Sequence, residues 1–315
     1  MSIEAERNKT GFWFTEDTGP DSRISLKLNS ILFSGSSPFQ KVDIISTSFG
    51  RTLVTDGKTQ SCENDEKVYH ESLVVPSFLK HGNPKKVFIG GGGEMATARE
   101  CLRFPGVEKV VMVDIDEAVV KMCMKHMPEW GENCWEDPRL DLIYGDAYGE
   151  FERMEEEWDV IILDISDPIE AGPGIKLYTK EFYEMAKKKL SPGGVFVTQS
   201  GCGAVNNWDD CWSSIYKTLD EVFDTVVPYR SNIPSFACPW AFTMGFSEPV
   251  GDFKTGNGVD EKIEQMKPVF KGKQTEYEYY DEETHRCMFS LEKQVRKGLQ
   301  AEKRVITMDN PVFMF

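Results

Sequence analysis

Acidic residues follow four short apolar runs of this 315-residue chain, and four consecutive glycines separate the first run from its acid. Carboxylates can bind cationic groups, accept hydrogen bonds from ribose hydroxyls, or take up a proton. The acids are Glu94 after residues 86–89, Asp114 and Asp116 after residues 109–113, Asp146 after residues 140–143, and Asp164 and Asp167 after residues 159–163. They form one site only if the fold brings the ends of these runs together.

The glycines at 90–93 predict a tight turn where the backbone approaches a ligand closely, because no Cβ stands in the way. Asp114 lies 20 residues after Glu94, the spacing at which such a strand–turn–helix unit places an acid on ribose hydroxyls. Dehydrogenases and methyltransferases share this pattern. It therefore predicts nucleoside binding and leaves the reaction open.

The later acids have competing interpretations. Asp116 fits a helix N-cap as well as a ligand, since strand-to-helix turns commonly use aspartate as a cap. Asp164 and Asp167 are three residues apart and precede Pro168 and a glycine-containing stretch at 170–174, which favours an active-site loop. Gathered carboxylates raise one another's pKa unless a cation is present, and a cationic ligand would supply that charge.

Alternating helices and strands from about residue 68 would position these acids. We expect strands at residues 86–89, 109–113, 140–143, 159–163 and 194–199, and helices at 69–81, 96–102, 117–126, 149–156 and 181–190. Apolar strands with helices between them predict a parallel sheet covered on both faces, with ligands outside the carboxyl ends of the strands. The expected fold class is α/β: a Rossmann-like, methyltransferase-type, mostly parallel sheet flanked by helices, with a small N-terminal β-rich domain.

Three parts of the chain are expected. Residues 1–65 would form the N-terminal domain, with strands at 41–49, 51–55 and 58–61 and a hairpin turn at Asp56-Gly57, serving oligomerisation and covering the site. Residues 66–250 would form the Rossmann-like catalytic domain. Residues 251–315 would be a charged, partly helical and peripheral extension, with its best helix at 291–301.

Composition excludes several classes of function. The net charge of −16 argues against a nucleic-acid partner, which calls for basic patches. The sequence has no run of about 18 apolar residues for a membrane span, and its N-terminus lacks the apolar core of a secretory signal. The eight cysteines form no C-x-x-C pair and the four histidines are not at ligand spacing. We therefore expect reduced thiols, no metal site and a cytoplasmic location.

The sequence resembles the aminopropyltransferases of the spermidine/spermine synthase family from about residue 11 to about residue 246. The matching motifs are PFQ at 38–40, LVTDGKTQ at 53–60, DEKVYHE at 65–71, GGGGE at 90–94, VDIDE at 113–117, GDA at 145–147, DISDP at 164–168, LYTKEFY at 177–183 and IPSF at 233–236. Within the family it is most similar to thermospermine synthases, in YHE at 69–71, GGGE at 91–94, IEAGP at 169–173 and IPSFA at 233–237. It departs from the family at Met95, where a small residue such as glycine is usual.

The resemblance implies a direct displacement. An amine of spermidine would attack the aminopropyl carbon beside the sulfonium of decarboxylated S-adenosylmethionine, and 5′-methylthioadenosine would leave. The attacking amine must first lose a proton. Asp164 is the expected acceptor, Tyr69 would orient the nitrogen, and Asp167 would grip a distal ammonium group. The resemblance implies no prosthetic group.

The resemblance also implies a donor site. Asp114 and Gln40 would contact the ribose, and Asp146 with the Ala147 N–H would read the adenine edge. Glu94 and Asp164 would face the aminopropyl ammonium. Further candidates for binding the donor are Gly91 and Ile115.

For four residues, the sequence allows two interpretations of their role. Tyr178 would line the adenine pocket or pack in the core. His70 would contact the amine or support a network around Asp167. Phe236 and Trp240 would cover the methylene chain of the polyamine, or belong to the core.

Other activities stay open. Spermine or spermidine synthesis would use the same site with another acceptor or product. An S-adenosylmethionine methyltransferase would bind the carboxylated cofactor more tightly. A decarboxylated donor needs no arginine to bind a carboxylate, so Arg99 is interpreted as structural. A non-catalytic polyamine-binding protein is the alternative from another class. The family usually forms dimers or tetramers through its N-terminal domain, so a homodimer or homotetramer is expected.

Overall fold

The computed structural model describes residues 11–19, 21–168, 172, 174–272 and 274–313. Its largest sheet has seven strands in the order β12-β13-β11-β10-β7-β8-β9. The bounds are β7 Lys86–Gly91, β8 Lys109–Asp114, β9 Leu140–Tyr144, β10 Trp158–Asp164, β11 Leu190–Cys202, β12 Thr225–Ile233 and β13 Cys238–Phe246. Strands β11, β10, β7, β8 and β9 are parallel, while β13 runs antiparallel to β11 and β12 antiparallel to β13. The predicted α/β class with a mostly parallel sheet is confirmed.

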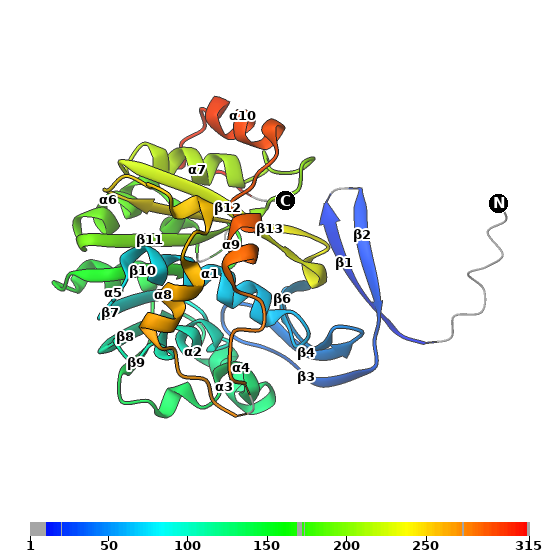
Figure 1. Ribbon diagram of the computed structural model, residues 1–315. Helices are drawn as coiled ribbons and strands as arrows, with labels where there is room; N and C mark the ends of the chain where they lie inside the picture. The colour runs from blue at the N-terminus through cyan, green and yellow to red at the C-terminus, as the bar shows by residue number, and fades with distance from the viewer. Residues whose placement is uncertain (1–10, 20, 169–171, 173, 273, 314–315) are drawn as a thin grey trace.

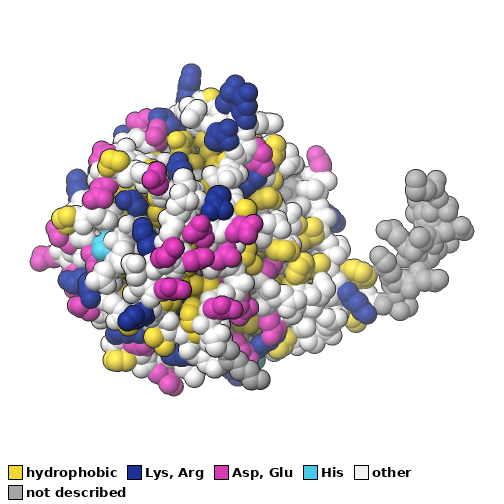
Figure 2. Space-filling view, viewed as in Figure 1, with side chains coloured by type: hydrophobic (Ala, Val, Ile, Leu, Met, Phe, Trp, Pro, Cys, Tyr) yellow, Lys and Arg dark blue, Asp and Glu magenta, His cyan; other side chains and the backbone are white. Residues whose placement is uncertain are grey.

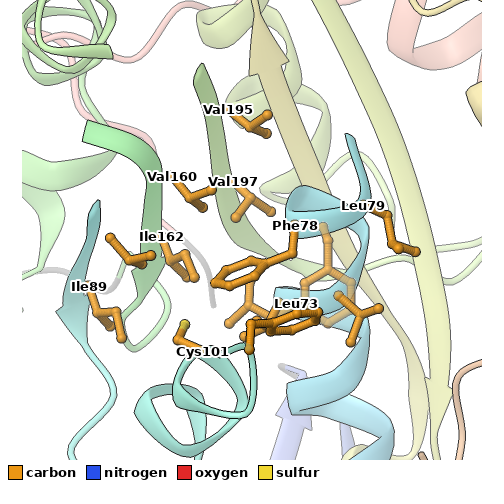
Figure 3. Close-up of a cluster of buried hydrophobic side chains, with 14 of the residues drawn as sticks. Leu73, Phe78, Leu79, Ile89, Cys101, Val160, Ile162, Val195 and Val197 are labelled. Atoms are coloured by element: carbon orange, nitrogen blue, oxygen red, sulfur yellow. The ribbon is translucent and has the colours of Figure 1, made fainter. Parts of the chain in front are cut away.

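Helices cover both faces of this sheet (Figure 1). They are α1 Glu66–His81, α2 Ala96–Leu102, α3 Glu117–His126, α4 Pro128–Gly131, α5 Ala147–Arg153, α6 Lys180–Lys188 and α7 Trp212–Asp220. Successive side chains of a strand point to opposite faces, so Val87 and Ile89 of β7 join one core and Phe88 joins the other. Figure 3 shows the first core, where Leu73 and Phe78 of α1 pack over Val160 and Ile162 of β10.

The N-terminal strands form two smaller sheets. Strands β1 Trp13–Gly19 and β2 Ser22–Lys27 make an antiparallel hairpin that projects from the body (Figure 1). Strands β3 Ser30–Ser36, β4 Lys41–Thr47, β5 Gly50–Thr55 and β6 Lys58–Cys62 form an antiparallel four-stranded sheet. Val42, Ile44 and Leu53 of this sheet pack on α3 and α4 through Val119, Cys123 and Trp130, which seats the sheet against the α/β body.

The C-terminal segment packs into the body, so the expectation of a peripheral tail was wrong. Its helices are α8 Val259–Met266, α9 Glu282–Met288 and α10 Lys293–Ala301. Glu71 of α1 accepts hydrogen bonds from the backbone N–H groups of Glu278, Tyr279 and Tyr280, at 2.9–3.1 Å. Phe289 stacks on Tyr229 of β12 with ring centroids 4.7 Å apart. The high charge of this segment hid the apolar positions that anchor it.

Other elements differ from the sequence prediction at their ends or were missed. Helices α2 and α3 have the predicted bounds, whereas α1 begins three residues earlier, at Glu66. Strand β11 begins at Leu190, four residues before the strand expected at 194–199. Strands β12 and β13 and helix α7 were not predicted, because they lie beyond the repeating strand–helix pattern. Among the described residues, no helix is both long and apolar enough to cross a membrane.

Candidate functional site

A cavity of about 840 Å³ lies at the carboxyl ends of the parallel strands, under the N-terminal strands. Twelve of the residues predicted from the sequence line it, so the predicted convergence of the strand ends is observed. They are Gln40, Tyr69, Gly91, Glu94, Asp114, Ile115, Asp146, Ala147, Asp164, Asp167, Phe236 and Trp240. The proposed cover from the N-terminal part includes Glu16, Asp17 and Lys58.

The glycine turn after β7 allows the ends of β8 and β10 to approach it closely. Gly91 has φ +84°, and a Cβ there would lie 2.1 Å from the carbonyl oxygen of Asp164. A Cβ on Gly93 would lie 2.9 Å from Asp114 Oδ2. Any other residue at these positions would push Asp164 or Asp114 away from the turn. The glycines therefore position both carboxylates as well as the backbone.

Met95 ends the turn in the left-handed conformation, with φ +75°, and its side chain is fully buried. This conformation costs a non-glycine residue about 1 kcal/mol, which agrees with the expectation of a small residue such as glycine at this position. Here the Met95 side chain joins the core beside Gly131, where an added Cβ would lie 2.9 Å from the Met95 Cβ. Burial of the methionine offsets the backbone cost.

Asp164 lies at the end of β10 between two hydroxyl donors. Tyr69 donates to Oδ1 at 2.7 Å and Thr97 of α2 donates to Oδ2 at 2.5 Å. Burial and the nearby Glu94 raise the pKa of Asp164 to about 6, against the lowering effect of His70 and of the two hydrogen bonds. A carboxylate with this pKa is ionised near neutral pH and can still accept a proton.

A chain of buried charges supports this region from behind the cavity. Arg99 of α2 donates to both carboxylate oxygens of Glu66, at 3.1 and 2.9 Å, and to the carbonyl of Trp130. His70 contacts Glu66 through Nδ1 at 2.9 Å and Glu94 through Nε2 at 3.0 Å. Arg99 is fully engaged in these contacts, in agreement with its structural interpretation.

His70 differs from both of its predicted roles. It is fully buried, does not line the cavity, and has its contacts with Glu66 and Glu94 instead of with the surroundings of Asp167. Burial opposes its charge, but the two carboxylates outweigh burial and raise the pKa of His70 to about 10. His70 therefore acts on the site through its contact with Glu94 and through the effect of its charge on Asp164.

The same three residues, His70, Glu94 and Asp164, bring their ligand atoms within 4.8 Å of one another. A metal would need a lone pair on an imidazole nitrogen. With its pKa raised to about 10, His70 is an imidazolium and both nitrogens donate to carboxylates. The donor set suits an internal cation better than a metal ion.

Asp167 follows Asp164 on the loop after β10 and is held by one amide. Gln199 of β11 donates from Nε2 to Asp167 Oδ1 at 3.1 Å, and also to the Ile165 carbonyl and the Tyr178 hydroxyl. Burial raises the pKa of Asp167 to about 6. Tyr178 is fully buried, and its hydroxyl donates to the Ser166 carbonyl at 3.2 Å. Tyr178 does not line the cavity. Of the two predicted locations, the core is therefore the one observed.

The acids after β8 and β9 sit at helix starts. Asp116 caps α3 by accepting from the N–H groups of Ala118 and Val119, and it also accepts from Ser37 Oγ and Gln40 Nε2. Asp146 caps α5 by accepting from Tyr148 N at 3.2 Å. Asp114 accepts from Asp116 N at 2.8 Å, and burial raises its pKa to about 7. The cap interpretation of Asp116 is thus observed.

Aromatic rings line the cavity near Asp164. Phe236 lies edge-on to Trp240, with ring centroids 4.7 Å apart, and Tyr69 is 5.9 Å from Phe236. Asp65 fixes the segment that carries Phe236 by accepting from the Ser235 N–H at 2.8 Å and hydroxyl at 2.9 Å. Phe236 and Trp240 face the cavity and also pack on the core, so their two interpretations coexist.

The charge of the cavity is strongly negative. Nine of the described lining residues are Asp or Glu, and Lys58 is the basic residue among them. No arginine lines the described part of the wall. The lining favours a ligand with several positive charges and no carboxylate of its own.

Sequence reasoning missed Thr97, Gln199 and the pairing of Glu66 with His70. Thr97 lies three residues after Glu94, and Gln199 ends a predicted strand, so the sequence places both near the strand ends without showing which acid each contacts. Glu66 and His70 lie one helical turn apart, so their pairing could be predicted only if helix α1 was expected to begin at Glu66. The IEAGP segment at 169–173 lies mostly outside the described residues.

Two family models match the chain. Residues 66–254 match the spermine/spermidine synthase domain, and residues 12–63 match the spermidine synthase tetramerisation domain. Together they cover both the α/β body and the N-terminal strands.

Individual relatives are similar over nearly the whole length. The polyamine aminopropyltransferase of Aeropyrum pernix is 38% identical over 304 residues, which are 96% of this chain and 95% of that protein. Thermospermine synthase ACAULIS5 of Arabidopsis thaliana is also 38% identical over 304 residues, covering 96% of this chain and 87% of that protein. A crystal structure of spermidine synthase in complex with the transition-state analogue AdoDATO superposes with a TM-score of 0.82 and 31% identity, covering 95% of this chain and 99% of that one.

Proposed function

The chain belongs to the spermine/spermidine synthase family and is an aminopropyltransferase, and from this premise we propose that it is a thermospermine synthase. It would transfer an aminopropyl group from decarboxylated S-adenosylmethionine to spermidine and release 5′-methylthioadenosine. The observation that carries the proposal is one acidic cavity in which Asp114 and Asp146 follow β8 and β9, while Asp164 and Asp167 follow β10 on the other side of β7.

The donor would occupy the end of the cavity formed by β7, β8 and β9. Asp114 would accept from the ribose hydroxyls, and Asp146 with the Ala147 N–H would bind the adenine edge. Gln40 would contact the ribose side, next to its hydrogen bond with Asp116. Glu94, held by the His70 cation, would accept from the aminopropyl ammonium. The scarcity of basic lining residues fits a donor that has lost its carboxylate.

The acceptor would occupy the end formed by β10, β11 and β13. Asp164 would take the proton from the attacking amine, while Tyr69 orients the nitrogen through the hydroxyl that already contacts Asp164. Asp167 would hold a distal ammonium, and Phe236 and Trp240 would cover the methylene carbons. The carbon–nitrogen bond then forms as the carbon–sulfur bond breaks, in line and without a covalent enzyme intermediate. Positioning and deprotonation supply the catalysis.

Spermidine as acceptor is supported by the YHE, GGGE and IPSFA motifs. An assay of purified protein with spermidine, putrescine and spermine, read by release of 5′-methylthioadenosine, tests this choice. Release with putrescine but not with spermidine would move the protein to spermidine synthesis. Chromatography of the product of spermidine then separates thermospermine from spermine, which differ in the end of spermidine that is extended.

The methyltransferase alternative is tested with the cofactors alone. Calorimetry with decarboxylated and with intact S-adenosylmethionine should show tighter binding of the decarboxylated compound, because the cofactor carboxylate would face Glu94 and Asp164. Tighter binding of the intact cofactor would contradict the proposed function.

We propose a homotetramer or homodimer formed through the N-terminal strands. Phe12, Trp13, Ile31, Leu32 and Phe39 are exposed there, with 82% of Phe12 and 60% of Ile31 accessible. Figure 2 shows hydrophobic side chains on the side of the molecule formed by these strands. Sedimentation of the protein and of Ile31→Glu should give an oligomer and a smaller species, respectively.

A further inference from the structure

Two cysteines lie together in the cavity wall at the acceptor end. Cys202 is the last residue of β11, and Cys238 is the first residue of β13. Both line the cavity and both are partly exposed, whereas Cys62, Cys101, Cys123, Cys134 and Cys211 are buried. Neither thiol has a part in the proposed transfer reaction.

The strand register places these cysteines on one face of the sheet. Cys202 pairs directly with Trp240, and Gly203 N donates to the Pro239 carbonyl at 2.7 Å. Cys238 is therefore the diagonal cross-strand neighbour of Cys202, and the two thiols are close enough to shift each other's pKa. Diagonal neighbours on antiparallel strands stand about 7–8 Å apart, slightly beyond the Cα separation of about 4.4–6.8 Å that a disulfide spans, so closing the bond requires a small movement of the strand ends.

The backbone on either side of the pair is irregular. The β11–β13 register shifts between Gln199 and Cys202. Ala237, directly before Cys238, is left-handed with φ +56°. A short adjustment of these strand ends leaves the central ladder from Phe196 to Gln199 in place.

We propose that Cys202 and Cys238 form a reversible disulfide, and that this bond lowers turnover by weakening acceptor binding. The first half of the inference is independent of the reaction, while the second half rests on the proposed function. The oxidant is a peroxide. Cys202 thiolate attacks one peroxide oxygen to give a sulfenic acid and releases water after protonation; the Cys238 thiol then displaces the second water as the sulfur–sulfur bond forms. The net change is two thiols and one hydrogen peroxide to one disulfide and two waters.

Cys202 is the better nucleophile of the two. The interaction with the Cys238 thiol lowers the pKa of Cys202, which favours attack by the partly exposed β11 sulfur. The same contact raises the pKa of Cys238. This division gives one attacking and one resolving thiol, the arrangement that favours a disulfide over further oxidation.

The bond would act on the acceptor half because of where the two residues lie. Cys238 is followed closely by Trp240 and preceded by Phe236, and Trp240 Nε1 donates to Gln199, which holds Asp167. Drawing β13 toward β11 shifts this aromatic wall and Asp167 together. The donor residues Asp114 and Asp146 follow β8 and β9, which are separated from β11 by β10 and β7. Donor affinity should therefore change little.

The first experiment treats the native, reduced protein with hydrogen peroxide and measures free thiols and disulfide-linked peptides by mass spectrometry. The expected result is loss of two of the eight thiols, a linked peptide containing Cys202 and Cys238, and recovery with a dithiol reductant. Cys238→Ser should form no such link. Cys287→Ser, which removes an exposed thiol on α9 away from the cavity, should still form it. Absence of the linked peptide in the native protein overturns the inference.

The second experiment measures calorimetric binding of spermidine and of 5′-methylthioadenosine to the reduced and oxidised protein. Spermidine should bind about tenfold more weakly after oxidation, the size expected when one charged contact is displaced, and the nucleoside should bind as before. Each variant is compared with its own reduced form, and Cys238→Ser should show no change on oxidation. Equal spermidine affinity in both states overturns the effect on the acceptor. If the Cys202–Cys238 disulfide forms but the protein has no transferase activity, the proposed function is contradicted and the inferred disulfide is still supported.

Discussion

The acids at the two ends of the cavity are held in different ways. At the donor end, Asp146 of the cavity lining and Asp116, which lies outside that lining, accept hydrogen bonds from backbone N–H groups at the starts of α5 and α3. At the acceptor end, β10 runs into a loop, so Asp164 accepts from the Tyr69 and Thr97 hydroxyls and Asp167 accepts from the Gln199 amide. Backbone N–H groups at a helix start stabilise a negative charge and fix the side chain.

This contrast teaches which acids can exchange protons. A capping carboxylate serves best while it stays ionised, because protonation would remove the acceptor from the helix start. Asp164 and Asp167 have no helix start, and burial raises the pKa of each to about 6. Asp114 lies between the two classes, since it accepts one N–H group and its pKa is raised to about 7. Position at a strand end alone therefore does not define a base.

The largest expected effect separates the two kinds of acid directly. Asp164→Asn should lower kcat by about 10³-fold or more, the size of a lost general base, while binding of 5′-methylthioadenosine survives. Asp116→Asn is the matched control, because asparagine also caps a helix, and it should cost far less activity. Steady-state kinetics with calorimetry of the nucleoside provides the test. Similar losses in both variants would break the comparison.

The second prediction concerns stability. The folded-state pKa of Asp164 is about 6, above its unfolded value near 4, so the folded protein binds this proton more tightly. The resulting destabilisation is absent below about pH 4, grows between pH 4 and 6, and is complete above pH 6. Asp164→Asn should therefore raise the free energy of unfolding at pH 7.5 by about 1–3 kcal/mol.

Thermal unfolding at two pH values checks this expectation. The gain in Tm should be present at pH 7.5 and should largely vanish at pH 4. An inactive variant that is more stable than the native protein would show that Asp164 is held ionised at a cost to folding. A variant that is less stable at both pH values would mean that Asp164 serves the fold, as the capping acids do.

Much of this site could be predicted from the sequence because its parts are local. Glu94, Asp114, Asp146 and Asp164 follow apolar runs directly, and parallel strands bring such positions to one edge. The partners of these acids could not be predicted in the same way. Thr97 reaches Asp164 across 67 positions and Ser37 reaches Asp116 across 79. Such contacts depend on packing angles that no short motif encodes.

His70 shows the same limit for a residue that the sequence did single out. Its place in the YHE motif predicted a role at the site, but not that its ring would lie between Glu66 and Glu94. The C-terminal segment shows a different limit. Its strong charge predicted an exposed tail, whereas Tyr280, Phe289 and other apolar residues, spaced between the charges, anchor it in the core.

The third prediction tests the buried cation that supports the acceptor end. The positive charge of His70 lowers the pKa of Asp164, although the hydrogen bonds of His70 go to Glu66 and Glu94. His70→Gln keeps a donor and removes the charge, so the pKa of Asp164 should rise by about one unit. Because the base must be ionised, the acidic limb of kcat/KM should move to higher pH by the same amount.

His285→Gln is the matched control for that measurement. His285 is also buried, but its pKa is lowered to about 4 by burial, so it is neutral, and it contacts Tyr280 and the Phe253 carbonyl in the C-terminal segment. Its removal should reduce stability and leave the acidic limb in place. A limb that moves equally in both variants would show a general loosening of the fold in place of a charge effect.

The smallest effect is expected from the second hydroxyl on Asp164. Thr97→Val keeps the shape of the side chain and removes only the donor to Oδ2. This hydrogen bond lowers the pKa of Asp164, so its loss should move the acidic limb upward by about half a pH unit. At pH 8 and above, where Asp164 is ionised in either case, kcat should stay within about twofold, and Thr97→Ser should restore the native profile.

A capping acid is fixed by its own helix, whereas Asp164 depends on side chains from α1 and α2. A large loss of kcat at every pH would mean that the Thr97 hydroxyl mainly fixes the direction of the carboxylate, and an unchanged limb would mean that Tyr69 alone sets the proton affinity of the base.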